Sequence, residues 1–225
     1  LITYYKLRRI AKDHRLDTLI IGLGPHNLGD YDLRQLKQQG WATERSMQRL
    51  APLISLREAW RLPLDRSYFL RSWFNTYCVW PRSMHDAYIG NFIKLHRPYK
   101  DDSEFTASRH FLEPDGTPAS PSPTALAFLD SIVSFTHQHH IQLVLLGVPD
   151  HPDYLRRIPS DFQQAYMTTS TLLRSEGVHV IDHISLYEQD SLFAMSDHLG
   201  ARGAKAFTVL LRDELSSRTD SLVAQ

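Results

Sequence analysis

A histidine with a carboxylate directly before it closes the segment Phe193-Ala194-Met195-Ser196-Asp197-His198. Gly200-Ala201-Arg202-Gly203-Ala204 follows and opens an amphipathic helix. An imidazole at the start of a helix can act as a general base when an acidic side chain fixes its tautomer. His198 is therefore a candidate base, with Asp197 as its candidate acidic partner. In the alternative interpretation, Ser196 or Asp197 only caps the helix.

Polar side chains also follow two earlier apolar runs. His26 and Asn27 come after the run at residues 18–21, and His151 comes after the run at 141–146. Ligands of parallel sheets bind where the carboxyl ends of the strands meet, so we expect these side chains near the candidate base. We expect His151 to contact an anionic or sugar substrate, and His26 to be a ligand contact or second base. A surface loop that binds nothing is the alternative for both histidines.

The elements that must position these residues alternate along the chain. Each short apolar run predicts a strand buried on both faces, and an amphipathic helical pattern precedes it. This order predicts an α/β three-layer sandwich, in which helices cover both faces of a parallel sheet. The expected strands cover residues 18–21, 141–146 and 178–181, and the expected helices cover 2–14, 123–139, 159–176 (with Gly177 ending it) and 201–215.

An insertion interrupts the alternation between about residues 41 and 98. Arg, Trp, Tyr and Leu recur there at helical spacing, which predicts two or three helices packed beside the sheet. Its aromatic side chains are expected to fill the packing between these helices, and a substrate groove is the alternative. The aromatic side chains in question are Trp60, Tyr68, Phe69, Trp73, Phe74, Tyr77 and Trp80.

Residues 99–123 contain four prolines, at positions 114, 118, 121 and 123. Pro114-Asp115-Gly116 predicts a turn, because proline fixes one dihedral and glycine accepts a positive one. His110-Phe111-Leu112 is expected to be a short extended piece, and residues 216–225 a frayed tail.

The composition narrows the classes of partner. The 225 residues hold 25 Lys+Arg and 25 Asp+Glu, so the formal net charge of zero supplies no basic face for nucleic acid. The single cysteine, Cys78, rules out an internal disulfide and a cysteine-based zinc site, and we expect it to be buried among aromatic residues. We expect no metal and no cofactor. No stretch reaches the roughly 18 apolar residues of a membrane span.

Residues 195–208 read Met-Ser-Asp-His-Leu-Gly-Ala-Arg-Gly-Ala-Lys-Ala-Phe-Thr. This segment resembles the closing block of the SGNH (GDSL-type) hydrolase superfamily, roughly Asp-x-x-His-Leu-Asn-x-x-Gly-Ala-x-x-Phe-Ser/Thr. Residues 20–27 resemble that superfamily's mid-domain strand, and residues 148–154 and 178–182 its later strand ends. The similarity is greatest to an envelope-modifying branch that includes DltD-like and alginate O-acetylation-type proteins.

The resemblance implies an SGNH/flavodoxin-like domain over residues 1–215. It implies an esterase or O-acyltransferase that acts on O-acyl esters of a cell-envelope glycan, or on a related small ester. A serine would be the nucleophile, His198 the base and Asn27 an oxyanion donor, whose contribution is about 3 kcal/mol in comparable enzymes. It also implies an extracytoplasmic location, periplasmic or membrane-anchored, with membrane-associated assembly partners.

Two departures from the family pattern open alternatives. The family's acidic triad residue falls on Met195, which leaves Asp197 as the substitute. No Gly-Asp-Ser, Gly-Ser-Ser or Gly-x-Ser-x-Gly block occurs, and we expect the nucleophile and the first strand to lie upstream of Leu1. One alternative is a catalytically inactive family member that serves as a binding or assembly subunit. Another is an unrelated α/β binding protein, in which His198 lies far from Asn27.

Overall fold

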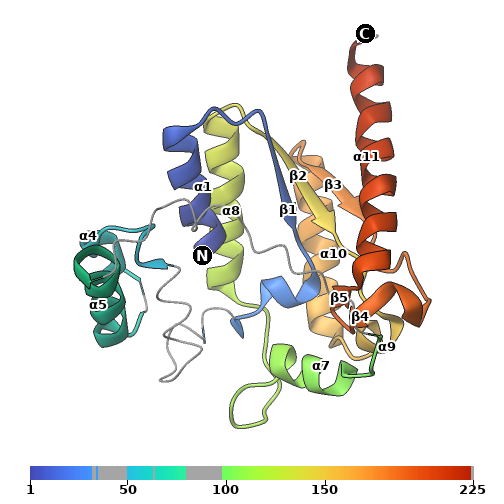
Figure 1. Ribbon diagram of the computed structural model, residues 1–225, viewed down its shortest axis with the longest axis horizontal. Coiled ribbons are helices and arrows are strands. Elements are labelled where there is room, and N and C mark those ends of the chain that lie inside the picture. Colours follow the sequence, from blue (N-terminus) through green and yellow to red (C-terminus); the bar gives the residue numbers. More distant parts are fainter. Residues whose placement is uncertain (32–33, 35–49, 63, 80–97, 224–225) are drawn as a thin grey trace.

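A three-stranded parallel sheet forms the centre of the molecule (Figure 1). The structure is a computed structural model that describes residues 1–31, 34, 50–62, 64–79 and 98–223. The strands are β1 (Thr18–Gly22), β2 (Gln142–Gly147) and β3 (His179–Asp182), in the order β1-β2-β3. The predicted α/β class with a parallel sheet is confirmed.

The strand register makes the three strands end at one edge of the sheet. Gly22 at the end of β1 is paired with Leu146 of β2, and Gly147 is paired with Asp182 at the end of β3. The loops that follow the strands therefore start side by side. This is the edge at which parallel sheets hold ligands.

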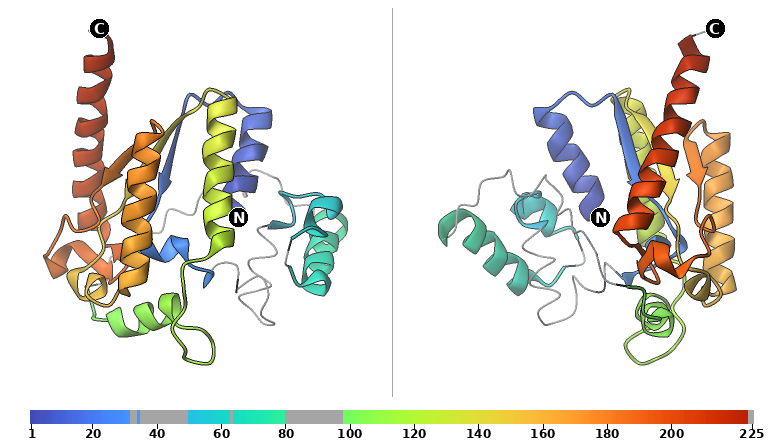
Figure 2. Two further views of the ribbon diagram at one scale, coloured as in Figure 1. Left: turned by 180° about the vertical axis from the view of Figure 1, so that it is seen from behind. Right: turned by 45° about the vertical axis from the view of Figure 1, so that its right-hand side comes forward.

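Helices lie on both faces of the sheet (Figure 2). Helices α1 (Ile2–Asp13), α8 (Pro123–Gln138) and α10 (Ser160–Ser175) pack on one face, and α11 (Ala201–Val223) packs on the other. The central strand β2 joins both cores, because successive side chains of a strand point to opposite faces. Leu143 and Leu145 pack with the first set of helices, and Val144 and Leu146 pack with α11.

Two helix ends follow directly from the sequence. The Ser122 hydroxyl accepts a hydrogen bond from the Ala125 amide at 3.2 Å and caps α8, whose first residue is Pro123. Gly177 has a φ of +84° and ends α10, as predicted. A residue with a Cβ adopts that conformation only at a cost, so glycine fixes where the chain turns towards β3.

The described part of the insertion is helical, as predicted. It contains α4 (Leu56–Ala59), α5 (Arg66–Phe74) and the π-helical turn η2 (Asn75–Val79). Phe69 is buried in a separate core that includes Tyr5 of α1. Trp60, Phe74 and Tyr77 are exposed, so they do not fill that core. Residues 41–49, 63 and 80–97, including Trp80, lie outside the described residues.

Several expectations were wrong. Helix α7 (Ser103–Phe111) includes His110 and Phe111, which were expected to be extended, whereas Leu112 is extended and forms a bridge with Pro118. The last helix continues to Val223, beyond the expected end at residue 215. Cys78 is exposed, not buried. Strand β1 is not buried on both faces: Ile20 is 45% exposed, because in the described sheet this strand lies at an edge and its burial alternates.

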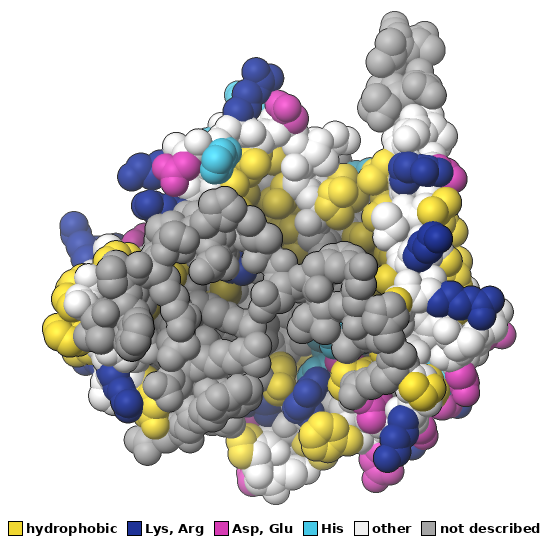
Figure 3. All heavy atoms as spheres, in the orientation of Figure 1, with side chains coloured by type: hydrophobic (Ala, Val, Ile, Leu, Met, Phe, Trp, Pro, Cys, Tyr) yellow, Lys and Arg dark blue, Asp and Glu magenta, His cyan; other side chains and the backbone are white. Residues whose placement is uncertain are grey.

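Charged side chains of both signs are intermixed on the face of the molecule shown in Figure 3. Arg8 forms a surface ion pair with Glu58 at 2.6 Å, and Arg15 forms one with Asp17 at 3.1 Å. Exposed pairs of this kind contribute about 0–1 kcal/mol each, so the stability of the fold comes mainly from the apolar cores.

The start of α11 requires a glycine. A Cβ at Gly203 would overlap the backbone carbonyl oxygen of Leu192, which also accepts a hydrogen bond from the Gly200 amide at 2.8 Å. We predict that Gly203→Ala lowers the free energy of unfolding by about 1–3 kcal/mol, because the backbone must shift to admit the methyl group. Urea unfolding monitored by circular dichroism measures this change.

Gly22→Ala is the matched control for that variant. A Cβ at Gly22 would meet the nearest atom, of Val148, at 3.8 Å, which is ordinary van der Waals contact. Equal loss of stability in the two variants would contradict the claim that close backbone packing fixes Gly203.

Candidate active site

Three loops meet at the carboxyl end of the sheet. The loop after β1 forms the 3₁₀ turn η1 (Pro25–Leu28), and the loop after β2 leads into the short helix α9 (Pro152–Leu155). The loop after β3 leads through η3 (Asp190–Leu192) to a hairpin of β4 (Phe193–Met195) and β5 (His198–Leu199). Backbone hydrogen bonds join these loops. The Asp150 amide donates to Ile184 and the His151 amide to Ser196, at 2.9 and 2.8 Å.

The tight turn between β4 and β5 presents Asp197 and His198 together. Nδ1 of His198 lies 2.6 Å from Oδ1 of Asp197. The Asp197 side chain is 4% exposed, whereas that of His198 is 57% exposed. Because an ionised carboxylate only accepts, the hydrogen bond places the proton of neutral His198 on Nδ1 and leaves Nε2 with its lone pair. This is the arrangement that a general base requires.

The charges around the pair shift both pKa values in useful directions. The hydrogen bond to Asp197 raises the pKa of His198, although burial acts the other way. Burial acts to raise the pKa of Asp197, but the hydrogen bond and charge of His198, with His110 and Arg109, lower it overall. Asp197 therefore remains ionised and continues to accept from the imidazole.

Helix α7 supplies a second layer of side chains behind Asp197. Arg109 Nη2 lies 3.5 Å from Asp197 Oδ2, and His110 Nε2 lies 4.0 Å from the same oxygen. Burial, followed by the charges of His26 and Arg109, lowers the pKa of His110 well below its ordinary value, so this imidazole stays neutral. Nδ1 of His110 is 2.7 Å from the hydroxyl of Tyr154, which is fully buried.

The turn after β1 adds an amide donor. The Gly24 amide donates to Oδ1 of Asn27 at 2.7 Å, which fixes the orientation of the Asn27 carboxamide. Its Nδ2 group therefore points away from the turn, and no described residue accepts a hydrogen bond from it. The neighbouring His26 ring stacks on His110, with ring centroids 4.8 Å apart.

A pocket of about 290 Å³ brings these groups together. It lies between η1, the first turn of α1, α7 and the β4–β5 turn. The size suits a small acyl group or one sugar unit rather than a long chain. The described residues that line it are Leu1, Ile2, Thr3, His26, Asn27, Gly29, Tyr31, Arg109, His110, Ala125, Phe128, Asp197 and His198.

Four of the five site residues predicted from the sequence line this pocket: His26, Asn27, Asp197 and His198. The interpretation in which Asp197 merely caps the last helix is wrong, because its carboxylate bonds to the His198 ring and α11 begins only at Ala201. The expectation of that interpretation, that His198 lies far from Asn27, is wrong as well.

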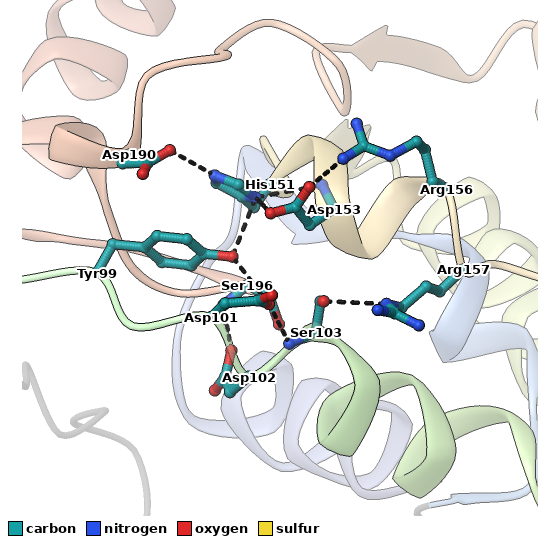
Figure 4. A network of polar contacts seen from close by, with 10 residues as sticks. All are labelled: Tyr99, Asp101, Asp102, Ser103, His151, Asp153, Arg156, Arg157, Asp190 and Ser196. Carbon is teal, nitrogen blue, oxygen red and sulfur yellow. Dashed lines mark hydrogen bonds and ion pairs between the residues drawn. The ribbon is translucent and has the colours of Figure 1, made fainter.

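His151 is not among the described residues that line the pocket; it belongs to a separate polar network (Figure 4). Its Nδ1 lies 3.1 Å from the Tyr99 hydroxyl and its Nε2 lies 3.1 Å from Asp190 Oδ1. The Tyr99 ring also stacks on it, with ring centroids 4.1 Å apart. The position of His151 therefore supports a role in tying residue 99 to the loop after β2, and does not support the predicted contact with substrate.

Sequence reasoning missed Arg109, His110, Tyr154 and Asp150, a buried carboxyl beside the pair. The first two lie on α7, a helix that was not predicted. Asp150 and Tyr154 lie in a loop already recognised as polar, but nothing in the local sequence distinguishes buried from exposed side chains there. The adjacent Arg109 and His110 were the one available signal of a charged cluster.

Comparisons with known proteins give no family for this chain. No protein-family model matches the sequence, and neither the curated proteins nor the solved structures contain a match. Within the described residues, no group of three or more His, Cys, Asp or Glu side chains is arranged to hold a metal ion. None of the helices in the described ranges is long and apolar enough to span a membrane.

The buried hydrogen bond between Tyr154 and His110 is expected to stabilise the site. Tyr154→Phe would leave the His110 Nδ1 atom without its 2.7 Å partner in a buried position. We predict a loss of about 1–3 kcal/mol in the free energy of unfolding, measured by urea denaturation.

Tyr187→Phe is the control, because no described residue forms a hydrogen bond with that hydroxyl and the ring packs against the core between the sheet and α11. We expect a change within about 0.5 kcal/mol for the control. An equally small change for Tyr154→Phe would show that the buried bond does not stabilise the site.

Proposed function

We propose that the chain is an SGNH-like hydrolase or acyltransferase that acts on O-acyl esters. The observation that supports this most is the meeting of a His–Asp pair and an oriented amide donor in one pocket. His198 and Asn27 come from loops 171 residues apart (198 minus 27) and line the same small cavity at the sheet edge. Acyl transfer needs this combination of base and oxyanion donor.

Each residue has a definite role in the proposed reaction. Nε2 of His198 takes the proton from an attacking hydroxyl as its oxygen bonds to the ester carbonyl carbon. The Asn27 Nδ2 group donates to the carbonyl oxygen, which becomes negatively charged as the C–O double bond opens. The imidazolium then returns the proton to the leaving alkoxide when the ester bond breaks, and Asp197 stabilises that imidazolium.

The attacking hydroxyl is proposed to be a serine or a water molecule. The resemblance to SGNH hydrolases favours a serine, but the described residues that line the pocket include none. Thr3 carries the one aliphatic hydroxyl among these described lining residues. The proposed acceptor is water or a sugar hydroxyl, and the proposed substrate class is an acylated glycan or a related small ester. A location outside the cytoplasm, with membrane-associated partners, belongs to the same proposal.

A second candidate function is binding of an acylated glycan without turnover. It is favoured by Met195, which occupies the position of the family's acidic triad residue, and by the lack of serine among the described lining residues. The close bond between Asp197 and His198 weighs against it, because a pocket that only binds has no need for an oriented imidazole. Turnover of an ester by the purified chain distinguishes the two.

The first test is hydrolysis of p-nitrophenyl acetate and release of acetate from an acetylated oligosaccharide. We expect His198→Ala to lower kcat/KM by about 10²–10⁴, the usual contribution of a general base. His14→Ala is the control, because His14 is exposed at the end of α1. Turnover that is equal in wild type and His198→Ala would contradict the proposed base, and binding of the oligosaccharide without turnover would favour the second candidate.

Asn27→Asp tests the oxyanion role separately. The variant keeps an oxygen to accept from the Gly24 amide but has no donor for the carbonyl oxygen. We expect kcat to fall by about 10²–10³. Thr3→Val is a second variant of the same pocket and should leave kcat unchanged if Thr3 is not the nucleophile. An unchanged kcat in Asn27→Asp would remove Asn27 from the mechanism.

The pH dependence follows from the raised pKa of His198. Only the neutral imidazole can accept a proton, so activity should rise with pH as His198 loses its charge. Because the Asp197 hydrogen bond raises the pKa of His198 above the ordinary 6.5, the midpoint of this rise should lie above pH 6.5. Asp197→Asn should move the midpoint to lower pH, as measured by kcat/KM over pH 5–9. A midpoint that does not move would mean that Asp197 does not set the pKa of the base.

A further inference from the structure

Asp150 is a buried carboxyl group without a partner among the described residues. It is 4% exposed and follows β2 in the loop that leads to α9. Its backbone amide donates to the Ile184 carbonyl, but its carboxyl group has no hydrogen bond or ion pair to any described side chain. An ionised carboxylate in such a place is costly, so the group favours its neutral form.

The position of Asp150 links it to the His–Asp pair. The next residue, His151, donates its backbone amide to Ser196 at 2.8 Å, and Ser196 directly precedes Asp197. This bond holds the loop that carries Asp150 against the turn that carries Asp197 and His198. Burial, and secondly the charge of Asp197, raise the pKa of Asp150 to about 8, while a charged His198 opposes this shift.

We propose that Asp150 is a positioning residue for the Asp197–His198 pair. While Asp150 is neutral, Asp197 is the carboxylate that binds the His198 ring. When Asp150 is ionised, its negative charge stabilises the protonated imidazole of His198. The proposal rests on the proposed function only in taking His198 to be the base. Asp150 would thereby move to higher pH the range over which His198 loses its proton and becomes available as a base.

The sign of the effect follows from the groups around the pair. When Asp150 loses its proton, its negative charge raises the pKa of His198, so the two titrations are linked. Arg109 acts in the opposite direction on His198, and the neutral His110 carries no charge that would replace that of Asp150. The charged and titratable groups that face this cluster in the described structure are Arg109 and His110 of α7, His26 of η1, Tyr154 of α9, and Asp197 and His198 of the β4–β5 turn.

The test is an NMR titration of the His198 imidazole in the full chain. In the wild type we expect a midpoint above that of Asp150→Asn, and a second inflection as Asp150 ionises. Asp150→Asn, which keeps the shape of the side chain, should show a single inflection at lower pH. Asp130→Asn is the control, because Asp130 is exposed on α8, and should titrate like the wild type. Superimposable curves for wild type and Asp150→Asn would overturn the proposal.

A second measurement needs no variant. A carboxyl-carbon NMR titration of Asp150 in the wild type should give a midpoint far above the ordinary 3.8. A midpoint near 3.8 would overturn the proposal even if Asp150→Asn failed to fold.

Thermal stability supplies a further check with a defined sign. The native state keeps a proton that the unfolded state releases, so the Tm of the wild type should fall relative to Asp150→Asn between about pH 4 and pH 8. A constant difference over that range would contradict a neutral Asp150.

These results separate the two proposals. If Asp150→Asn shifts the His198 titration but the chain hydrolyses no ester, the proposed function fails and the role of Asp150 stands. If esters are hydrolysed through His198 and the titration does not depend on Asp150, the positioning role fails and the proposed function stands.

Discussion

The pairing of β2 with a parallel strand on each side is the constraint on which the candidate site depends. Gly22 aligns with Leu146, and Gly147 aligns with Asp182, so all three strands stop at the same edge. Because β2 also divides its side chains between the two cores, a slip by one residue would move both sets of leucines and valines to the wrong face. The hydrophobic effect therefore holds the register, and the register brings the loop of Asn27 to the turn of His198.

At that edge, neighbouring side chains stabilise a buried negative charge. Asp197 loses most of its contact with water, which would favour its neutral form, yet His198, His110 and Arg109 keep it ionised. The same arrangement leaves His198 half exposed and oriented, with its second nitrogen available. Asp150 differs from Asp197, because it is buried without a hydrogen-bond or ion-pair partner in the described structure, and its pKa is therefore raised. Two carboxyl groups in one cluster thus have different protonation states for reasons of environment alone.

Much of the scaffold could be predicted from the sequence. The short apolar runs predicted all three strands, and Gly177 predicted the end of α10. The rule that ligands bind at strand ends correctly grouped Asn27 with His198. The proposed chemistry came from the resemblance to SGNH hydrolases. Composition and residue spacing alone do not predict it.

Helix α7 was missed because polar side chains make up much of its buried face. Ser103, Thr106 and His110 are buried on it, whereas Phe105 is 66% exposed. Ala107 and Phe111 are its buried apolar residues, which is a weak signal in a search for apolar residues at helical spacing, and Arg109 and His110 were therefore missed with it. The orientation of His151 depends on Tyr99, which lies 52 positions away in the sequence, so no local pattern could predict it.

The central claim is that Asp197 fixes His198 with Nδ1 protonated and Nε2 free to accept a proton. The ¹⁵N chemical shifts of the His198 ring, recorded at a pH where the imidazole is neutral, measure this directly. The account predicts a protonated Nδ1 and a bare Nε2, with the Nδ1 proton shifted downfield by its bond to Asp197. A ring that carries its proton on Nε2 would contradict the account, because such an imidazole could not act as the base in this pocket.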